Sequence, residues 1–134
     1  MSRKNARDCA FKLIFEIPFH DGITPDERVE QYFEYGEYED INTNDKEYIS
    51  VTVCDCFNNI EAIDKKISDS LENWRLDRLS KIDLSILRLA AAEILFNSDI
   101  PFRVSVNEAV ELAKTYSEDN SPSFVNGVLS KFEG

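Results

Sequence analysis

The segment that most constrains the fold is DLSILRLAAAEILF, residues 83–96, in which apolar side chains occur on almost every side of a helix. A helix that is apolar all round is typically buried at the centre of a domain, because only neighbouring helices can cover all of its faces. Ser80 and Asp83 stand at the start of this run with the spacing of a helix cap. The sequence therefore predicts a central helix here, surrounded by others.

The segments on either side also have helical period, and several begin with residues that cap helices. No segment alternates convincingly between apolar and polar residues, as a strand would. The sequence therefore predicts an all-α fold of six or seven helices in a single domain spanning residues 1–134. One helix is expected to begin at Thr24-Pro25-Asp26-Glu27 and to end at Gly36, and a long one to begin at Asn44 with Glu47 and to break near Asn58-Asn59. The next helix is expected to begin at Ser105 with Glu108, and the last at Ser121-Pro122.

The first predicted helix, which Pro18 ends, combines an apolar face with a small basic end. Residues 1–16 carry four cations and two acids, whereas residues 21–47 carry ten acids and two cations. The whole chain has a formal net charge of −11, which by itself argues against nucleic-acid binding. The basic end is either an ordinary solvated face or a weak electrostatic footprint for nucleic acid. Its cations, which we expect on the side away from the apolar face, are Arg3, Lys4, Arg7 and Lys12.

No sequence feature indicates an enzyme or a cofactor. The four glycines stand alone, so no phosphate-binding loop is present. Asp40, Asn42 and Asn44 begin like a calcium-binding EF-hand loop, but Asp45 and Val51 occupy the positions that require Gly and Glu. We interpret these residues as a helix start with solvated acids, and we expect a protein without catalytic activity.

Metal binding through soft ligands and membrane insertion are equally unsupported. His20 is the single histidine, and together with Cys54 and Cys56 it does not give a recognisable zinc spacing. We expect these cysteines and Cys9 to be reduced and His20 to lie at the surface. No apolar stretch approaches the length of about 18 residues that a membrane span needs, and the N-terminus lacks the apolar core of a secretory signal. The expected location is the cytoplasm.

Two positions within the apolar helices need an explanation. Arg88 is the single cation in LSILRLAAA, and it either pairs with a carboxylate, such as Glu93 or one on a neighbouring helix, or reaches a nucleic-acid phosphate or a partner. Asn126-Gly127 is a typical turn dipeptide, yet it interrupts a segment with helical period. Gly127 costs a helix about 1 kcal/mol relative to Ala. We therefore predict that another helix approaches closely at Gly127.

Several stretches together resemble the NusB family of bacterial transcription antitermination factors. SRKNARDCAFKLIFE resembles the opening helix of that family, and LSILRLAAAEIL, DIPFRVSVNEAVELAK and FVNGVL follow in the family's order and spacing. The resemblance implies about seven helices and a role without catalysis. It also implies binding of the boxA element of ribosomal RNA transcripts, together with the ribosomal protein NusE, in an RNA polymerase complex that contains other Nus factors. Whether the protein is a monomer or a homodimer is left open.

The resemblance further implies which residues contact RNA and the protein partner. Cations of the first helix meet phosphates, and an exposed aromatic ring at the last helix stacks on an unpaired base with about 1–3 kcal/mol. Phe124 has core packing as its alternative, and Arg88 faces either RNA or the partner. The sparse cations leave a second function open, a protein-interaction module with little RNA affinity. The implied RNA residues are Arg3, Lys4, Arg7, Lys12, Arg88, Ser123, Phe124 and Asn126, and the implied NusE residue is Asp83.

Overall fold

The structure is a computed structural model that describes residues 2–36 and 41–133. All regular secondary structure in these residues is helical, which confirms the predicted all-α class and the number of helices. Asp40, the first residue of the EF-hand-like stretch, lies outside the described residues. The helices are α1 (Arg3–Glu16), η1 (Ile17–Phe19), α2 (Pro25–Tyr35), α3 (Thr43–Asn58), α4 (Ile60–Asp69), η2 (Leu76–Arg78), α5 (Lys81–Phe96), α6 (Phe102–Tyr116) and α7 (Ser121–Ser130).

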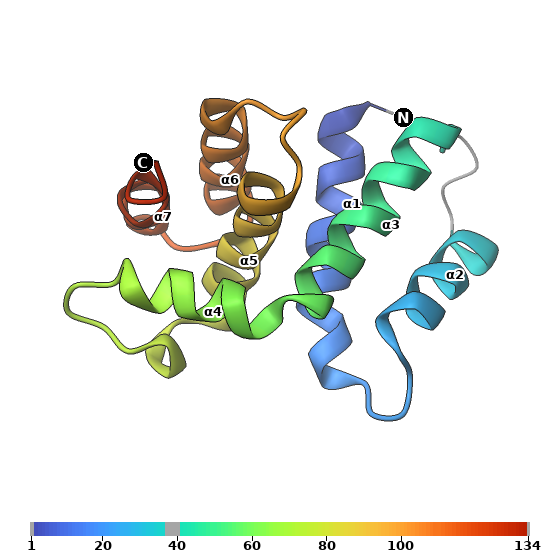
Figure 1. Cartoon of the computed structure of the whole chain (residues 1–134), viewed down its shortest axis with the longest axis horizontal. Coiled ribbons are helices and arrows are strands. Elements are labelled where there is room, and N and C mark those ends of the chain that lie inside the picture. Colours follow the sequence, from blue (N-terminus) through green and yellow to red (C-terminus); the bar gives the residue numbers. More distant parts are fainter. Residues whose placement is uncertain (1, 37–40, 134) are drawn as a thin grey trace.

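Helix α5 is the centre of the molecule, as its apolar sequence predicts. It packs against α1, α3, α4, α6 and α7, and its residues from Leu84 to Leu87 and from Leu89 to Glu93 are buried. In Figure 1, α1 and α3 lie on one side of α5, and α6 and α7 lie on the other. Helix α2 packs against the outside of α3. The core therefore forms around α5, and the α1 and α7 surfaces lie on opposite sides of it.

Two of the predicted helix starts are confirmed by side-chain hydrogen bonds. Thr24 Oγ1 accepts a hydrogen bond from the backbone N–H of Glu27 at 3.1 Å, and Ser80 Oγ accepts one from that of Asp83 at 3.0 Å. The predicted break near Asn58-Asn59 is also present, because α3 ends and α4 begins there. Local capping chemistry therefore fixes these boundaries.

The predicted starts of α3 and α6 are wrong. Helix α3 is capped by Asn42, whose Oδ1 accepts from the N–H of Asp45 at 2.8 Å, so Asn44 lies inside the first turn. Helix α6 begins directly after Pro101, because the fixed φ of proline suits a helix start, and Ser105 lies inside the helix. In both cases an earlier residue supplies the helix start.

The C-terminal end of α2 differs from its prediction, whereas the cysteines and His20 agree with theirs. Gly36 follows α2 with an extended backbone at φ −73°, not the left-handed conformation of a typical C′ glycine. Cys9, Cys54 and Cys56 are free thiols, and His20 is exposed, as expected. Within the described parts of the chain, no helix has the length and apolar character needed to cross a membrane.

Candidate nucleic-acid interface

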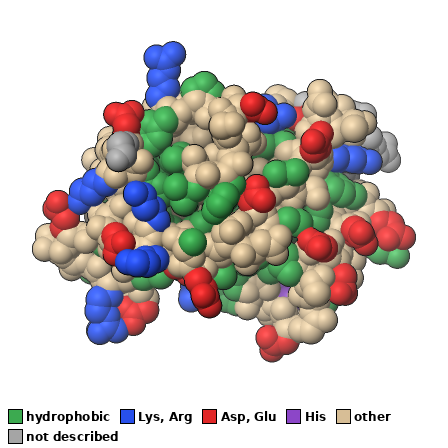
Figure 2. Space-filling view, in the orientation of Figure 1, with side chains coloured by type: hydrophobic (Ala, Val, Ile, Leu, Met, Phe, Trp, Pro, Cys, Tyr) green, Lys and Arg blue, Asp and Glu red, His purple; other side chains and the backbone are tan. Residues whose placement is uncertain are grey.

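Charge is unevenly distributed over the surface. On the face shown in Figure 2, most Lys and Arg side chains gather over the side of α4 and α7, and most Asp and Glu side chains lie over the side of α2 and α3. A strongly acidic chain repels nucleic acid unless cations are concentrated locally. The position of each cation therefore decides where an anionic partner can bind.

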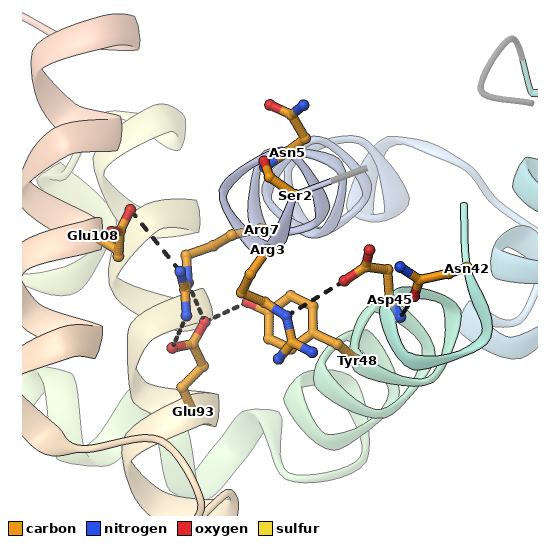
Figure 3. Close-up of polar contacts among 9 residues, drawn as sticks. All are labelled: Ser2, Arg3, Asn5, Arg7, Asn42, Asp45, Tyr48, Glu93 and Glu108. Atoms are coloured by element: carbon orange, nitrogen blue, oxygen red, sulfur yellow. Dashed lines mark hydrogen bonds and ion pairs between the residues drawn. The ribbon is translucent and has the colours of Figure 1, made fainter. Parts of the chain in front are cut away.

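Arg7 is buried and forms an ion pair with Glu93, and the contacts around this pair connect four helices (Figure 3). Its side chain on α1 donates from Nε to Oε2 of Glu93 on α5 at 2.7 Å and from Nη2 to Oε1 at 3.2 Å. The hydroxyl of Tyr48 on α3 donates to Oε2 of Glu93, and the hydroxyl of Ser105 on α6 donates to Oε1 at 2.9 Å. Glu108 adds a second carboxylate 3.9 Å from Arg7 Nη1. The carboxylate of Glu93 thus accepts four hydrogen bonds from three neighbouring helices.

The expectation that Arg7 lies on the solvent side of the first helix is therefore wrong, because only 5% of the residue is exposed. Helix α1 packs against both α3 and α5, so its buried stripe is wider than the apolar positions alone indicate. Burial acts to lower the pKa of Arg7, but its hydrogen bond to Glu93 and the negative charges around it raise the pKa above its usual value. Burial, followed by the charge of Glu93, raises the pKa of Tyr48. Arg7 stays charged and Tyr48 stays a hydrogen-bond donor.

The other three cations of α1 are exposed. Arg3 lies with its guanidinium 4.4 Å from the ring centre of Tyr48 and its Nε 3.6 Å from Oδ1 of Asp45. Lys12 Nζ lies 2.9 Å from Oδ2 of Asp8, and half of its side chain remains exposed. Lys4 points to the surface at the same end of the helix as Arg3. The exposed cations of α1 are therefore Arg3, Lys4 and Lys12, and Arg7 is not among them.

A groove of about 270 Å³ separates α1 from α6 beside these cations. Lys4 lies on its α1 wall, whereas Glu108 and Glu111 lie on its α6 wall. Tyr116 closes one part of it by donating its hydroxyl to Asp8, and this hydrogen bond raises the pKa of Tyr116. The acidic far wall makes the outer rim of α1, rather than the floor of the groove, the part that suits a phosphate.

The start of α7 exposes part of the predicted RNA-contacting set. Ser123 and Asn126 are exposed, and Phe124 is half-buried, because one side of its ring packs on the core while the residue also lines two adjoining surface grooves. Phe124 therefore packs on the core, and the part of it that remains accessible faces the grooves; its contact with RNA stays a prediction. The predicted close approach at Gly127 is wrong, since a Cβ atom built there would meet nothing within 4 Å. The glycine in α7 has no packing reason within the described chain.

Asp83 and Arg88 both have partners on neighbouring helices. The carboxylate of Asp83 accepts hydrogen bonds from the hydroxyls of Ser117 at 2.5 Å and Ser121 at 3.1 Å, so it joins the start of α5 to the end of α6 and the start of α7. Arg88 donates two hydrogen bonds to Asp64 on α4, at 2.9 and 2.8 Å. The interpretation of Arg88 as a cation paired with a carboxylate on a neighbouring helix is therefore confirmed.

Two features, one buried and one at the surface, are absent from the sequence-based expectations. The first is the network of Tyr48, Glu93 and Ser105, whose members are widely separated in the chain. The second is Trp74, the single tryptophan, of which 61% is exposed. A signal for it exists in the sequence, because Trp74 stands in the polar stretch SLENWRLDR, where no apolar period indicates a core position.

Comparison with known proteins identifies the family. The sequence matches the NusB family over residues 4–134. It is 46% identical over 131 residues to the transcription antitermination protein NusB of Natranaerobius thermophilus, with 98% of this chain and 94% of the relative covered. It is 49% identical over 129 residues to the protein of the same name in Clostridium acetobutylicum, with 96% and 93% covered.

Solved structures agree with the sequence comparison. The fold superposes on NusB of T. maritima with a TM-score of 0.84 and 39% identity, covering 98% of this chain and 89% of the other. It superposes with a TM-score of 0.80 and 34% identity on a chain in the crystal structure of antitermination factors NusB and NusE in complex with dsRNA, covering 96% and 93%. Because sequence and fold agree over almost the whole length, the chain belongs to the NusB family.

Proposed function

We propose that this protein is a transcription antitermination factor that binds boxA-type single-stranded RNA together with the ribosomal protein NusE. It acts in the cytoplasm by binding, without catalysis or a cofactor, and joins RNA polymerase through other Nus factors. The support is family membership and the likeness to a NusB chain solved with NusE and dsRNA. The observation that carries the RNA-binding part is the group of exposed cations on α1, in a chain whose net charge is −11.

The geometry divides the implied RNA residues into two groups. Arg3, Lys4 and Lys12 are accessible to phosphates, and the start of α7 offers an aromatic ring beside exposed polar side chains. Arg7 and Arg88 are occupied by carboxylates, so we assign them the role of holding α1 and α4 in place. Positioned cations contribute to RNA affinity mainly by neutralising phosphates, which is independent of base sequence. Base preference therefore belongs to the residues Ser123, Phe124 and Asn126.

Asp83 remains the candidate contact for NusE. Its carboxylate is held by the two serine hydroxyls at the junction of α5, α6 and α7, and it lines a groove at the surface. A carboxylate fixed in this way is preorganised to accept a hydrogen bond or an ion pair from a protein partner. Substitution of Asp83 by Asn is expected to weaken NusE binding.

Titration of a fluorescently labelled boxA-type RNA, with and without NusE, tests the proposal. The double substitution Arg3→Ala with Lys4→Ala is expected to weaken RNA binding about tenfold, equivalent to ~1.4 kcal/mol. The control is Lys65→Ala with Lys114→Ala, which removes two exposed cations from α4 and α6 and changes the net charge equally. Binding that is equally tight for an unrelated RNA, with or without NusE, would contradict the proposal.

A second function, a protein-interaction module with little RNA affinity, is favoured by one specific observation. Of the four cations on α1, Arg7 is buried, and Arg3 and Lys12 each have a carboxylate within 4 Å. If this function holds, the Arg3 and Lys4 substitutions leave RNA association unchanged while NusE binding persists. The same titration therefore separates the two functions.

A further inference from the structure

Arg3, the first residue of α1, lies against two side chains of α3 (Figure 3). Its guanidinium lies 4.4 Å from the centre of the Tyr48 ring, and its Nε lies 3.6 Å from Oδ1 of Asp45. Neither contact is a hydrogen bond, and the guanidinium donates none to the residues that the structure describes. Since 45% of its side chain is exposed, Arg3 keeps its N–H donors available to an anion from solvent.

Asp45 and Tyr48 are themselves held in place by the fold. Asp45 lies in the first turn of α3, where its backbone N–H donates to Oδ1 of Asn42 at 2.8 Å. Tyr48 lies about one turn later on the same helix, is buried, and donates its hydroxyl to Oε2 of Glu93 in the core. The side chain of Arg3 therefore rests on two groups that do not move with it.

Asp45 is a buried carboxylate with unfilled hydrogen-bonding capacity. Only 4% of the residue is exposed, and its Oδ2 has no hydrogen-bond partner among residues 2–36 and 41–133. Within the same residues, Arg3 is the one cation within 4.0 Å of it. Burying such a carboxylate lowers stability, and its place in the first turn of a helix offsets only part of this cost. The contact with Arg3 gives the charge of Asp45 a reason to be there.

We propose that Asp45 and Tyr48 are positioning residues, which hold the guanidinium of Arg3 at the surface in the orientation that meets an RNA phosphate. A mobile arginine side chain loses rotamer freedom when it binds a phosphate, whereas one that is already held loses less and binds more tightly. Tyr48 supports the guanidinium through its ring, and Asp45 attracts it from the Nε side, so the two Nη groups remain for the phosphate. The proposal rests on the proposed function and gives α3 a part in it, although neither residue touches RNA.

The opposite interpretation of the same contact is that Asp45 neutralises Arg3 and repels phosphates. The two interpretations predict opposite signs for Asp45→Asn, which removes the negative charge and keeps the shape of the side chain. Positioning predicts that RNA binding weakens about fivefold, because Arg3 becomes mobile. Neutralisation predicts that RNA binding becomes tighter, because a negative charge beside the phosphate is lost.

Glu47→Gln is the matched control for this change of charge. Glu47 is exposed on the same helix and lines a surface groove of about 430 Å³ together with Arg3. Its replacement removes the same negative charge near Arg3 without removing a group that holds the guanidinium. Glu47→Gln is therefore expected to bind RNA at least as tightly as the unchanged protein.

Titration of labelled boxA-type single-stranded RNA with the protein–NusE complex measures these affinities, and circular dichroism checks that each variant is folded. Tyr48→Leu is expected to weaken RNA binding about fivefold as well, and Tyr48→Phe, which restores the ring, is expected to recover the affinity. Tyr48→Phe still lacks the hydroxyl that donates to Glu93, so its free energy of unfolding should fall. Recovery of binding without recovery of stability is a result that a purely structural role of Tyr48 does not give.

A double-mutant cycle shows whether Asp45 acts through Arg3. In the Arg3→Ala background, Asp45→Asn is expected to cause no further loss of RNA affinity, because the side chain that Asp45 holds is absent. A loss of equal size in both backgrounds would overturn the proposal. If the unchanged protein with NusE binds boxA-type RNA and Asp45→Asn binds it as tightly or more tightly, the positioning role fails and the proposed function stands. If the unchanged protein with NusE binds no such RNA, the proposed function fails, and the positioning role fails with it.

Discussion

At the residue scale, Glu93 is the point where α1, α3, α5 and α6 are joined. A buried ion pair stabilises a fold only if its hydrogen-bonding capacity is filled, because removing two charges from water is costly. Arg7, Tyr48 and Ser105 together supply four donors to the Glu93 carboxylate. The Glu93 carboxylate therefore has its hydrogen-bonding capacity filled, and removal of either Arg7 or Glu93 leaves the charge of the other buried without compensation.

Arg7→Met is consequently expected to lower the free energy of unfolding by about 3–5 kcal/mol. Guanidinium chloride unfolding, followed by circular dichroism, measures the effect. Lys4→Met is the control, because Lys4 is an exposed cation three residues earlier on the same helix, and it should change stability by less than about 0.5 kcal/mol. The double variant Arg7→Met with Glu93→Leu should recover much of the loss. Equal stability of Arg7→Met and the unchanged protein would contradict the structural role of Arg7.

The thiols are expected to be unreactive in the folded protein. Burial, together with the hydrogen bond to Asp26, raises the pKa of Cys54 to about 11, and burial raises the pKa of Cys56 to about 12. Burial also raises the pKa of Cys9. Since the thiolate is the reactive form, Cys54 and Cys56 should react with a disulfide reagent at pH 8 on the order of 100-fold more slowly than free cysteine. In denaturant all three should react rapidly; fast labelling of the folded protein would contradict the burial described.

At the element scale, sequence reasoning succeeded where the determinants are local. The apolar run of α5 and the caps at Thr24 and Ser80 act within a few residues, so the central helix and two helix starts were predicted correctly. The starts of α3 and α6 were missed because an earlier Asn or Pro competed with a plausible cap downstream.

The candidate site was less predictable than the fold, because its arrangement depends on distant parts of the chain. Arg7 and Glu93 are separated by 86 residues, and no periodicity links them. A cation on an amphipathic helix is normally exposed, so the burial of Arg7 follows only from the presence of Glu93 on the packed face of α5. Helical period likewise placed Gly127 within the last helix, but it did not reveal that no other helix packs against that glycine.

Helix α7 should gain stability when Gly127 is replaced. Gly127→Ala adds a methyl group in open space and removes the conformational cost of glycine, so the free energy of unfolding should rise by about 0.5–1 kcal/mol. Thermal unfolding should show a higher midpoint. Gly22→Ala is the contrasting control, because Gly22 has a φ of +81° and its replacement should destabilise the protein. A loss of stability in Gly127→Ala would show that the packing around α7 is tighter than described.

At the scale of the whole molecule, the charge distribution restricts how RNA approaches. The acidic side chains over α2 and α3 repel phosphates, whereas most Lys and Arg side chains on the same face lie over the side of α4 and α7 (Figure 2). The number of phosphates that the protein contacts can be measured from the salt dependence of RNA binding.

Each phosphate neutralised on single-stranded RNA contributes about 0.7 to the slope of log K against log salt concentration. Contacts from Arg3, Lys4 and Lys12 give a slope near −2, because three phosphates contribute about 0.7 each. The double variant Arg3→Ala with Lys4→Ala should therefore lower the magnitude of the slope by about 1.4, whereas the control Lys65→Ala with Lys114→Ala should leave it unchanged despite the same loss of charge. Equal slopes in all three proteins would contradict phosphate contacts by Arg3 and Lys4, because cations that touch no phosphate release no counterions.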